Sequence, residues 1–263
     1  MKVRVLFDSW EFEGAALFFD KDGTLTDLRH QYINLMEKRL ERLSVISPFD
    51  KAETRRAIGL AGGYDKKTKT ISPVGLLATG TRTETVAAAA KALAEQGMAM
   101  DKALKIVKQA FLEADQELSL VDLIKPADGL FQVLSSLYLR GLVIACLTND
   151  ESERTEKILH LLGVKSFFHL VICGNEVVCP KPDSEMFYQA CNCLGVLPSQ
   201  VAYVGDSMVD IAMARSAGAG GVVGILGGAG ERDVLQVEAD VVIPDLKAIS
   251  VRADSPFGRR AMN

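Results

Sequence analysis

The sequence predicts an α/β fold in which a doubly wound parallel sheet carries an inserted, mostly helical domain. Short runs of consecutive apolar residues, closed by glycine or polar residues, alternate with amphipathic helical patterns along most of the 263-residue chain. This alternation implies right-handed crossovers and a parallel sheet with helices on both faces. Residues 28–126 carry helical patterns without a clear buried strand, which predicts the insertion.

Six apolar runs are interpreted as core strands because they are rich in Val, Ile and Leu and end abruptly. They are Ala16–Phe19, Leu142–Leu147, Phe168–Cys173, Val201–Val204, Gly221–Leu226 and Asp240–Ile243. Val3–Phe7 and Trp10 are expected to form an extra strand or an N-terminal patch on the same core.

Helical periodicity with start and stop signals predicts the helices between these strands. In the core they are Gly129–Leu139, Glu153–Leu162, Ser184–Leu194 and Met208–Ala217. In the insertion they are Gln31–Leu43, Thr83–Gln96 and Asp101–Leu118, and Gly62–Pro73 is interpreted as an exposed turn or loop. The predicted domains are residues 1–27 with 127–263, and residues 28–126. An insertion at a strand end is well placed to act as a lid.

Composition excludes several classes of partner. The formal net charge of -4 gives no global positive field for a nucleic acid. The apolar stretch Ala217–Gly230 is shorter than the roughly 20 residues of a bilayer span, and the acidic N-terminal segment does not resemble a signal peptide. The five cysteines form no CxxC pair, which indicates neither zinc nor a disulfide framework. We therefore expect a cytoplasmic protein without membrane or nucleic-acid partners.

The first strand leads into Asp20-Lys21-Asp22-Gly23-Thr24. Side chains two residues apart on an extended chain point the same way, so Asp20 and Asp22 converge. Two converging carboxylates repel and must share a cation, a proton or both. Gly23 permits a tight turn that brings a backbone N–H close to a ligand.

A second acidic pair follows Val201–Val204. Asp206 and Asp210 are four residues apart at a helix start and share one face. Oxygen ligands without histidine or cysteine favour Mg²⁺ over zinc.

Two further polar groups lie beside strands. Thr148 and Asn149 precede a helix N-terminus, a natural seat for a phosphate. Lys181 lies between Pro180 and Pro182, whose fixed φ angles restrict its direction. Each of these groups alone also fits a structural interpretation: a helix cap, a turn residue or a surface charge.

In this order, the four motifs DxDGT, T-N, K-P and GDxxxD resemble those of the haloacid dehalogenase (HAD) superfamily on its phosphatase side. The resemblance covers about residues 14–27 and 127–245, and the phosphoglycolate-phosphatase-like group is the best subfamily label. The insertion resembles the helical C1 cap of this superfamily. Lys21 departs from the commoner apolar residue between the two aspartates and is interpreted as a neutral variation that adds a positive charge.

The resemblance implies a Mg²⁺-dependent phosphatase that cleaves a small phosphorylated metabolite. Asp20 corresponds to the nucleophile and Asp22 to the acid/base. The resemblance assigns Mg²⁺ to the Asp20 and Asp206 carboxylates and the Asp22 carbonyl, with Asp210 supporting. Phosphoryl oxygens are assigned to Thr148 and to backbone groups of Asn149 and Gly23, and Lys181 is assigned to charge neutralisation.

Alternatives stay open at this point. A phosphomutase of the β-phosphoglucomutase kind shares all four core motifs, and a catalytically inactive binding protein on this fold is a more remote alternative. Dehalogenation and phosphonate hydrolysis are disfavoured because those branches lack an aspartate matching Asp22. Six cap cations could grip a substrate anion, although each alone fits a solvated charge: Arg55, Arg56, Lys66, Lys67, Lys69 and Arg82. The sequence leaves monomer and homodimer equally open.

Overall fold

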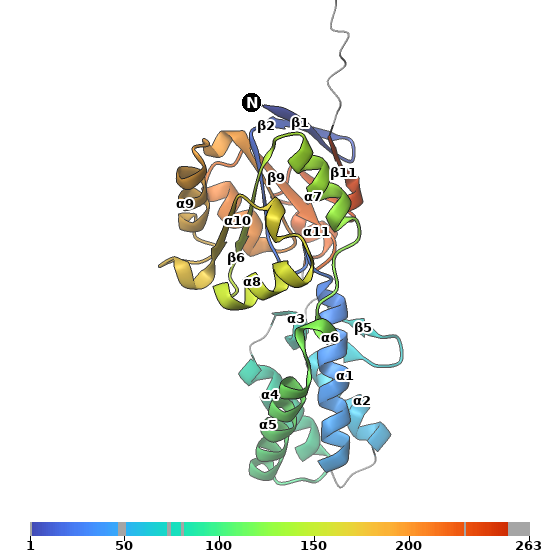
Figure 1. Ribbon diagram of the computed structural model, residues 1–263. Helices are drawn as coiled ribbons and strands as arrows, with labels where there is room; N and C mark the ends of the chain where they lie inside the picture. The colour runs from blue at the N-terminus through green and yellow to red at the C-terminus, as the bar shows by residue number, and fades with distance from the viewer. Residues whose placement is uncertain (1, 47–50, 73–74, 80–81, 229, 252–263) are drawn as a thin grey trace, which may run out of the picture. The chain divides into compact units, whose positions relative to one another are not determined.

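The computed structural model describes residues 2–46, 51–72, 75–79, 82–228 and 230–251. Its described residues divide into two compact units (Figure 1). The core unit contains those up to Leu25, from Ala127 to Leu226 and from Arg232 onward. The insertion unit contains those of Thr26–Pro126 and Gly227–Glu231.

The core unit is built on a six-stranded parallel sheet of order β10-β9-β8-β3-β6-β7. All six predicted strands are confirmed: β3 has the predicted ends, and the other five differ by one or two residues at an end. They are β3 (Ala16–Phe19), β6 (Val143–Thr148), β7 (Leu170–Cys173), β8 (Val201–Gly205), β9 (Gly221–Ile225) and β10 (Val241–Ile243). The first strand in sequence, β3, lies between β6 and β8.

Helices cover both faces of this sheet (Figure 1), as the fold class requires. Side chains alternate along β3, so Leu17 and Phe19 join one buried cluster while Ala16 and Phe18 join the other. Helices α7 (Leu130–Leu139) and α8 (Ser152–Leu161) contribute to the first cluster; α9 (Glu185–Leu194), α10 (Met208–Ser216) and α11 (Arg232–Leu235) contribute to the second. The described part of this unit also contains four 3-10 turns: η1 (Lys165–Phe167), η2 (Gly174–Glu176), η3 (Pro198–Gln200) and η4 (Leu246–Ala248).

A separate antiparallel sheet of order β11-β1-β2 lies in the same unit. The expected strand Val3–Phe7 is confirmed as β1, and it pairs with β2 (Trp10–Gly14) and β11 (Ile249–Val251). Trp10, expected in an extra strand or patch, begins β2. The rest of β2 and all of β11 were not expected, because each alternates buried with exposed residues instead of forming a continuous apolar run.

The insertion unit is mostly helical, and its three predicted helices are confirmed. Its helices are α1 (Leu28–Ile46), α2 (Lys51–Gly62), α3 (Leu76–Thr79), α4 (Arg82–Glu95), α5 (Met100–Glu117) and α6 (Leu120–Leu123). The interpretation of Gly62–Pro73 as a loop is wrong in part, because β4 (Tyr64–Asp65) and β5 (Thr70–Ile71) form a short hairpin there. Pro73 lies outside the described residues.

The chemistry-bearing motifs all belong to the core unit. None of the helices among the described residues has the length and apolarity that a membrane span requires.

Candidate active site

Three neighbouring strands bring the predicted motif residues to one edge of the core sheet. Phe19, the last residue of β3, lies beside Cys146 of β6 and Val204 of β8. Asp20, Thr148 and Asp206 occur at or just after the ends of these strands. Because parallel strands end at a common edge, residues far apart in sequence meet there.

Asp20, Asp206 and Asp210 form a buried carboxylate cluster. One oxygen from each lies within 4.8 Å of the others, and the three residues are 7%, 3% and 2% exposed. The Asp22 carboxylate is not a member of this cluster; Asp22 contributes a separate contact described below.

Lys181 inserts its ammonium into the cluster. Its Nζ lies 2.6 Å from Asp20 Oδ1 and 2.7 Å from Asp210 Oδ1, and its side chain is 2% exposed. The Asn149 side chain fixes the Lys181 backbone, because Asn149 Nδ2 donates to the Lys181 carbonyl at 3.0 Å and Lys181 N donates to Asn149 Oδ1 at 2.9 Å. Asn149 therefore orients Lys181, a role that the sequence did not suggest.

Asp210 is held by four donors. Its Oδ1 accepts from Lys181 and from the Tyr203 hydroxyl at 3.0 Å, while its Oδ2 accepts from the backbone N–H and hydroxyl of Ser207. A carboxylate has about four lone-pair sites, so these four bonds use nearly all of them. A Cβ at Gly205 would lie 2.4 Å from Asp210 Cβ, so glycine is needed for this close approach.

Gly23 and Thr148 lie in the loops that leave β3 and β6. Gly23 has φ of 86°, a left-handed conformation that glycine adopts without strain. Thr148 is buried, and its Oγ1 accepts the backbone N–H of Asp150 at 3.2 Å. Both residues are thus fixed by local backbone geometry.

Lys21 has specific partners that the sequence analysis did not identify. Its side chain is fully buried, with Nζ 2.6 Å from Asp22 Oδ2 and 3.0 Å from Asp150 Oδ2. Burial opposes charge on Lys21, but Asp22 and Asp150 outweigh it and raise its pKa. Two features of the sequence could have suggested this ion pair. The first motif contains a lysine, Lys21, and an acid, Asp150, directly follows Thr148-Asn149.

Electrostatics sets the cluster apart from ordinary surface acids. The pKa of the Asp20 carboxyl rises from 3.8 to about 7, chiefly through burial; Lys181 opposes the rise, and Asp210 and Asp22 add to it. Burial alone would lower the pKa of Lys181, but Asp20 and Asp210 hold it above its ordinary value. Lys181 therefore stays an ammonium beside the cluster.

The donor set of the cluster fits Mg²⁺. Counted in their carboxylate forms, the three acids against the single ammonium of Lys181 would leave two formal negative charges for a cation to balance. The cluster has only oxygen donors, which hard divalent cations prefer. Asp20 and Asp206 would hold the ion; Asp210, whose oxygens are already engaged, would support them.

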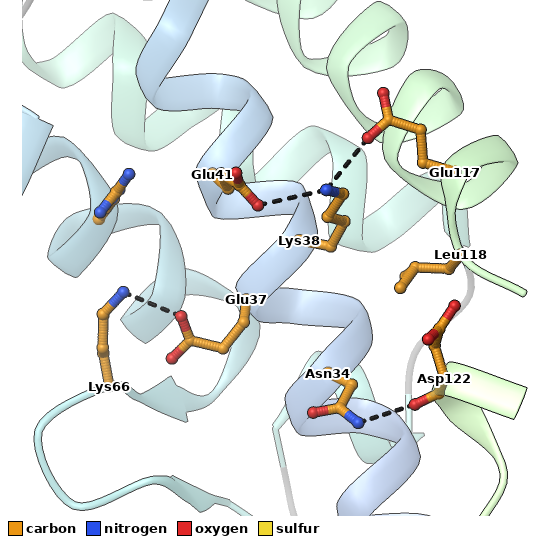
Figure 2. Close-up of a pocket in the computed structure, with 9 residues that line it drawn as sticks. Asn34, Glu37, Lys38, Glu41, Lys66, Glu117, Leu118 and Asp122 are labelled. Carbon is orange, nitrogen blue, oxygen red and sulfur yellow. Dashed lines mark hydrogen bonds and ion pairs between the residues drawn. The ribbon is translucent and has the colours of Figure 1, made fainter.

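The insertion unit has a polar pocket of its own, of about 670 Å³. Figure 2 shows acids and bases around it that already pair with one another, such as Lys66 with Glu37 at 2.9 Å and Lys38 with Glu117 at 3.1 Å. Two other cations proposed for substrate binding also have partners: Arg55 donates to Ser44 Oγ and Arg82 to Asp115. These side chains are engaged within the insertion unit.

Comparison with known proteins gives a family and several relatives. A family model described as haloacid dehalogenase-like hydrolase matches residues 15–218. The chain is 28% identical over 204 residues to an N-acetylmuramic acid 6-phosphate phosphatase of Pseudomonas aeruginosa, covering 77% of this chain and 78% of that protein.

Two further similarities are more limited. A phosphoglycolate phosphatase of Thiobacillus denitrificans is 32% identical over 122 residues, which cover 46% of this chain and only 54% of that protein. The solved structure of a predicted phosphoglycolate phosphatase from Haemophilus somnus superimposes with a TM-score of 0.60 at 22% identity, covering 89% of this chain and 95% of that one. The structural likeness supports the fold alone.

Proposed function

Since the chain belongs to the haloacid dehalogenase-like hydrolase family and is a phosphoric monoester hydrolase, we propose that it is a Mg²⁺-dependent phosphatase using an aspartyl-phosphate. One observation carries the mechanism: the buried Asp20 carboxylate lies at the sheet edge beside Asp206, Asp210 and Lys181. A carboxylate in this setting can attack phosphorus once the surrounding negative charge is balanced.

In the first step, an Asp20 oxygen forms a bond to phosphorus while the bond from phosphorus to the substrate oxygen breaks. Asp22 donates its proton to the leaving oxygen, which departs as an alcohol. In the second step, Asp22 takes a proton from water as the water oxygen attacks phosphorus. The bond to Asp20 then breaks and releases inorganic phosphate.

The other residues bind and orient. Thr148 and backbone groups of Asn149 and Gly23 would hold the phosphoryl oxygens, and Lys181 would offset their charge. Asp20, Asp206 and the Asp22 carbonyl would hold Mg²⁺, with Asp210 supporting them. When bound, the ion would supply the charge neutralisation that lets a carboxylate approach an anionic phosphate.

The substrate is a small phosphorylated metabolite, and the insertion unit acts as its cap. Support comes from the relatives, which are named for N-acetylmuramic acid 6-phosphate and phosphoglycolate. We place the enzyme in the cytoplasm as a monomer or homodimer.

The test measures inorganic phosphate release with Mg²⁺ from p-nitrophenyl phosphate and a panel containing both of these monoesters. We expect Asp20→Asn to lose activity by about 10³-fold or more, because the amide cannot form the acyl phosphate. The matched control Asp233→Asn, exposed on α11, should keep wild-type turnover. Wild-type turnover in Asp20→Asn would overturn the mechanism.

Two other outcomes test the alternatives. Isomerisation of glucose 1-phosphate without release of phosphate would favour a phosphomutase. No phosphate release from any compound, with a folded protein, would favour a binding protein.

A further inference from the structure

Lys21 is a fully buried lysine beside the proposed nucleophile. A buried ammonium is costly unless it is paired and hydrogen-bonded. Buried between Asp20 and Asp22 in sequence, Lys21 therefore needs charged partners that hydrogen-bond to it. Residues of the core unit provide them.

One partner, Asp150, is fixed independently of Lys21. Arg154 Nε donates to Asp150 Oδ2 at 3.0 Å, and the backbone N–H of Glu151 donates to Asp150 Oδ1 at 2.9 Å. Asp150 N in turn donates to Thr148 Oγ1. The Asp150 carboxylate thus anchors the Lys21 ammonium at the start of α8.

The second partner, Asp22, lies in a turn whose backbone is closed by Leu25 N donating to the Lys21 carbonyl at 2.8 Å. The turn fixes the backbone of Asp22, but the χ angles of its side chain still need a fixed partner. Its side chain is 31% exposed, and Lys21 Nζ reaches Asp22 Oδ2 at 2.6 Å. The anchored ammonium is such a partner.

We propose that Lys21 is a positioning residue, which holds the Asp22 carboxyl group in one orientation by donating from its Nζ to Asp22 Oδ2, while Asp150 anchors the ammonium. The proposal rests on the function above, in which Asp22 carries the proton. Once Asp22 has donated its proton, Arg154, Asp150, Lys21 and Asp22 form a row of four alternating charges that balance formally. Removing Lys21 leaves Asp150 paired with Arg154 but takes the Lys21 contact away from Asp22 Oδ2.

The experiment compares wild type, Lys21→Met and the surface control Lys157→Met, which is exposed on α8. We expect Lys21→Met to lower kcat/KM for the fastest alkyl monoester of the panel by about 10- to 100-fold, the cost of a misplaced proton donor. With p-nitrophenyl phosphate the loss should be at least about five-fold smaller, because its leaving phenolate needs little protonation. Equal losses for both substrates would overturn the proposal.

A double-mutant cycle separates positioning from a structural role. In an Asp22→Asn background, Lys21→Met should change kcat/KM by less than about two-fold, since the group it positions is gone. An undiminished loss in that background would show that Lys21 acts elsewhere. If Lys21→Met does not fold, as judged by circular dichroism, Lys21→Gln takes its place in both measurements, with smaller losses expected.

The controls distinguish the two proposals. Wild-type turnover in Asp20→Asn or Asp22→Asn would sink the proposed function. If both of those variants lose activity while Lys21→Met stays within about two-fold of wild type on the alkyl monoester, only the positioning role fails.

Discussion

Asp210 shows how a single residue of the site depends on its neighbours. Its carboxylate accepts hydrogen bonds from Lys181, Tyr203 and Ser207. In the sequence, Tyr203 belongs to the apolar run of a predicted strand. In the structure its hydroxyl donates to Asp210 and also lies 3.4 Å from the Leu147 carbonyl oxygen. Fully buried, it ties β8 to the carboxylate cluster.

We predict that Tyr203→Phe lowers the free energy of unfolding by about 2 kcal/mol, because a buried hydrogen bond to a carboxylate is lost without a replacement donor. Urea denaturation followed by circular dichroism measures the change. Tyr188→Phe is the matched control, since Tyr188 is 43% exposed on α9. Equal stability of Tyr203→Phe and wild type would contradict the hydrogen bond.

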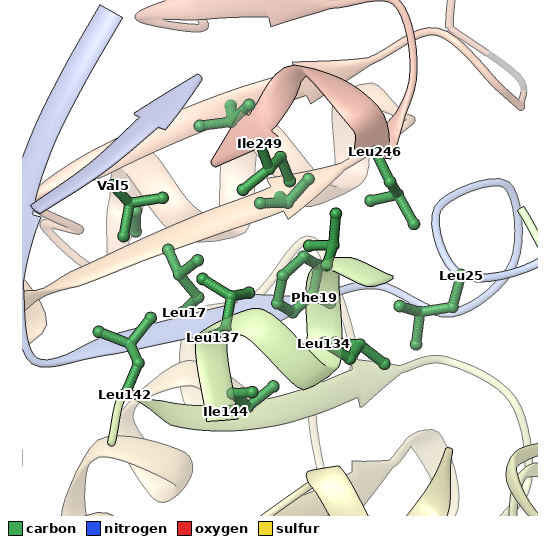
Figure 3. Packing of buried hydrophobic residues seen from close by; sticks show 14 of the residues in the cluster. Val5, Leu17, Phe19, Leu25, Leu134, Leu137, Leu142, Ile144, Leu246 and Ile249 are labelled. Atoms are coloured by element: carbon green, nitrogen blue, oxygen red, sulfur yellow. The ribbon is translucent and has the colours of Figure 1, made fainter. Parts of the chain in front are cut away.

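At the scale of elements, α7 shows what a predicted amphipathic stripe does in the fold. Leu134 and Leu137 pack against Leu17 and Phe19 of the central strand, as Figure 3 shows, and Leu130 belongs to the same buried cluster. The strand that leads into Asp20 is therefore held from this side by α7.

We predict that Leu134→Ala lowers the free energy of unfolding by about 2 to 5 kcal/mol, because it removes apolar contacts and leaves a cavity. Leu139→Ala on the same helix should change it by less than about 0.5 kcal/mol, because Leu139 is 82% exposed. Chemical denaturation of both variants measures the difference. Similar losses in the two variants would contradict the packing.

At the scale of the whole molecule, the carboxylate cluster links stability to pH. Asp20 has its pKa raised from 3.8 to about 7, so between these values the folded protein binds a proton that the unfolded chain has lost. The stability contributed by this group is fully present below about pH 4. It is lost as the pH rises through about 7.

In buffer with EDTA, we therefore expect the free energy of unfolding of wild type, relative to Asp20→Asn, to fall from pH 4 to pH 8 and to level off above that. Urea denaturation at each pH measures the difference. Asp233→Asn should track wild type throughout, because Asp233 is exposed. A difference between wild type and Asp20→Asn that does not vary with pH would contradict the raised pKa.

Periodicity was sufficient to predict the parallel sheet and most of the long helices, including α4 and α5, but α2 (Lys51–Gly62) was missed. It did not predict β2, whose residues alternate between buried Phe12 and exposed acids, because such a strand gains its identity from pairing with β1. The hairpin of β4 and β5 was not predicted either, because each of its strands has only two residues, too few to form a recognisable pattern.

The sequence by itself determined which residue types follow which strands, because each motif is a local pattern at the end of an apolar run. Tertiary structure alone decided the partners: Lys181 with Asp20, Lys21 with Asp150, and Tyr203 with Asp210. The physical reason is that hydrophobic periodicity specifies the face on which a side chain lies. The order of strands in the sheet and the packing around each side chain then decide which charged group it meets.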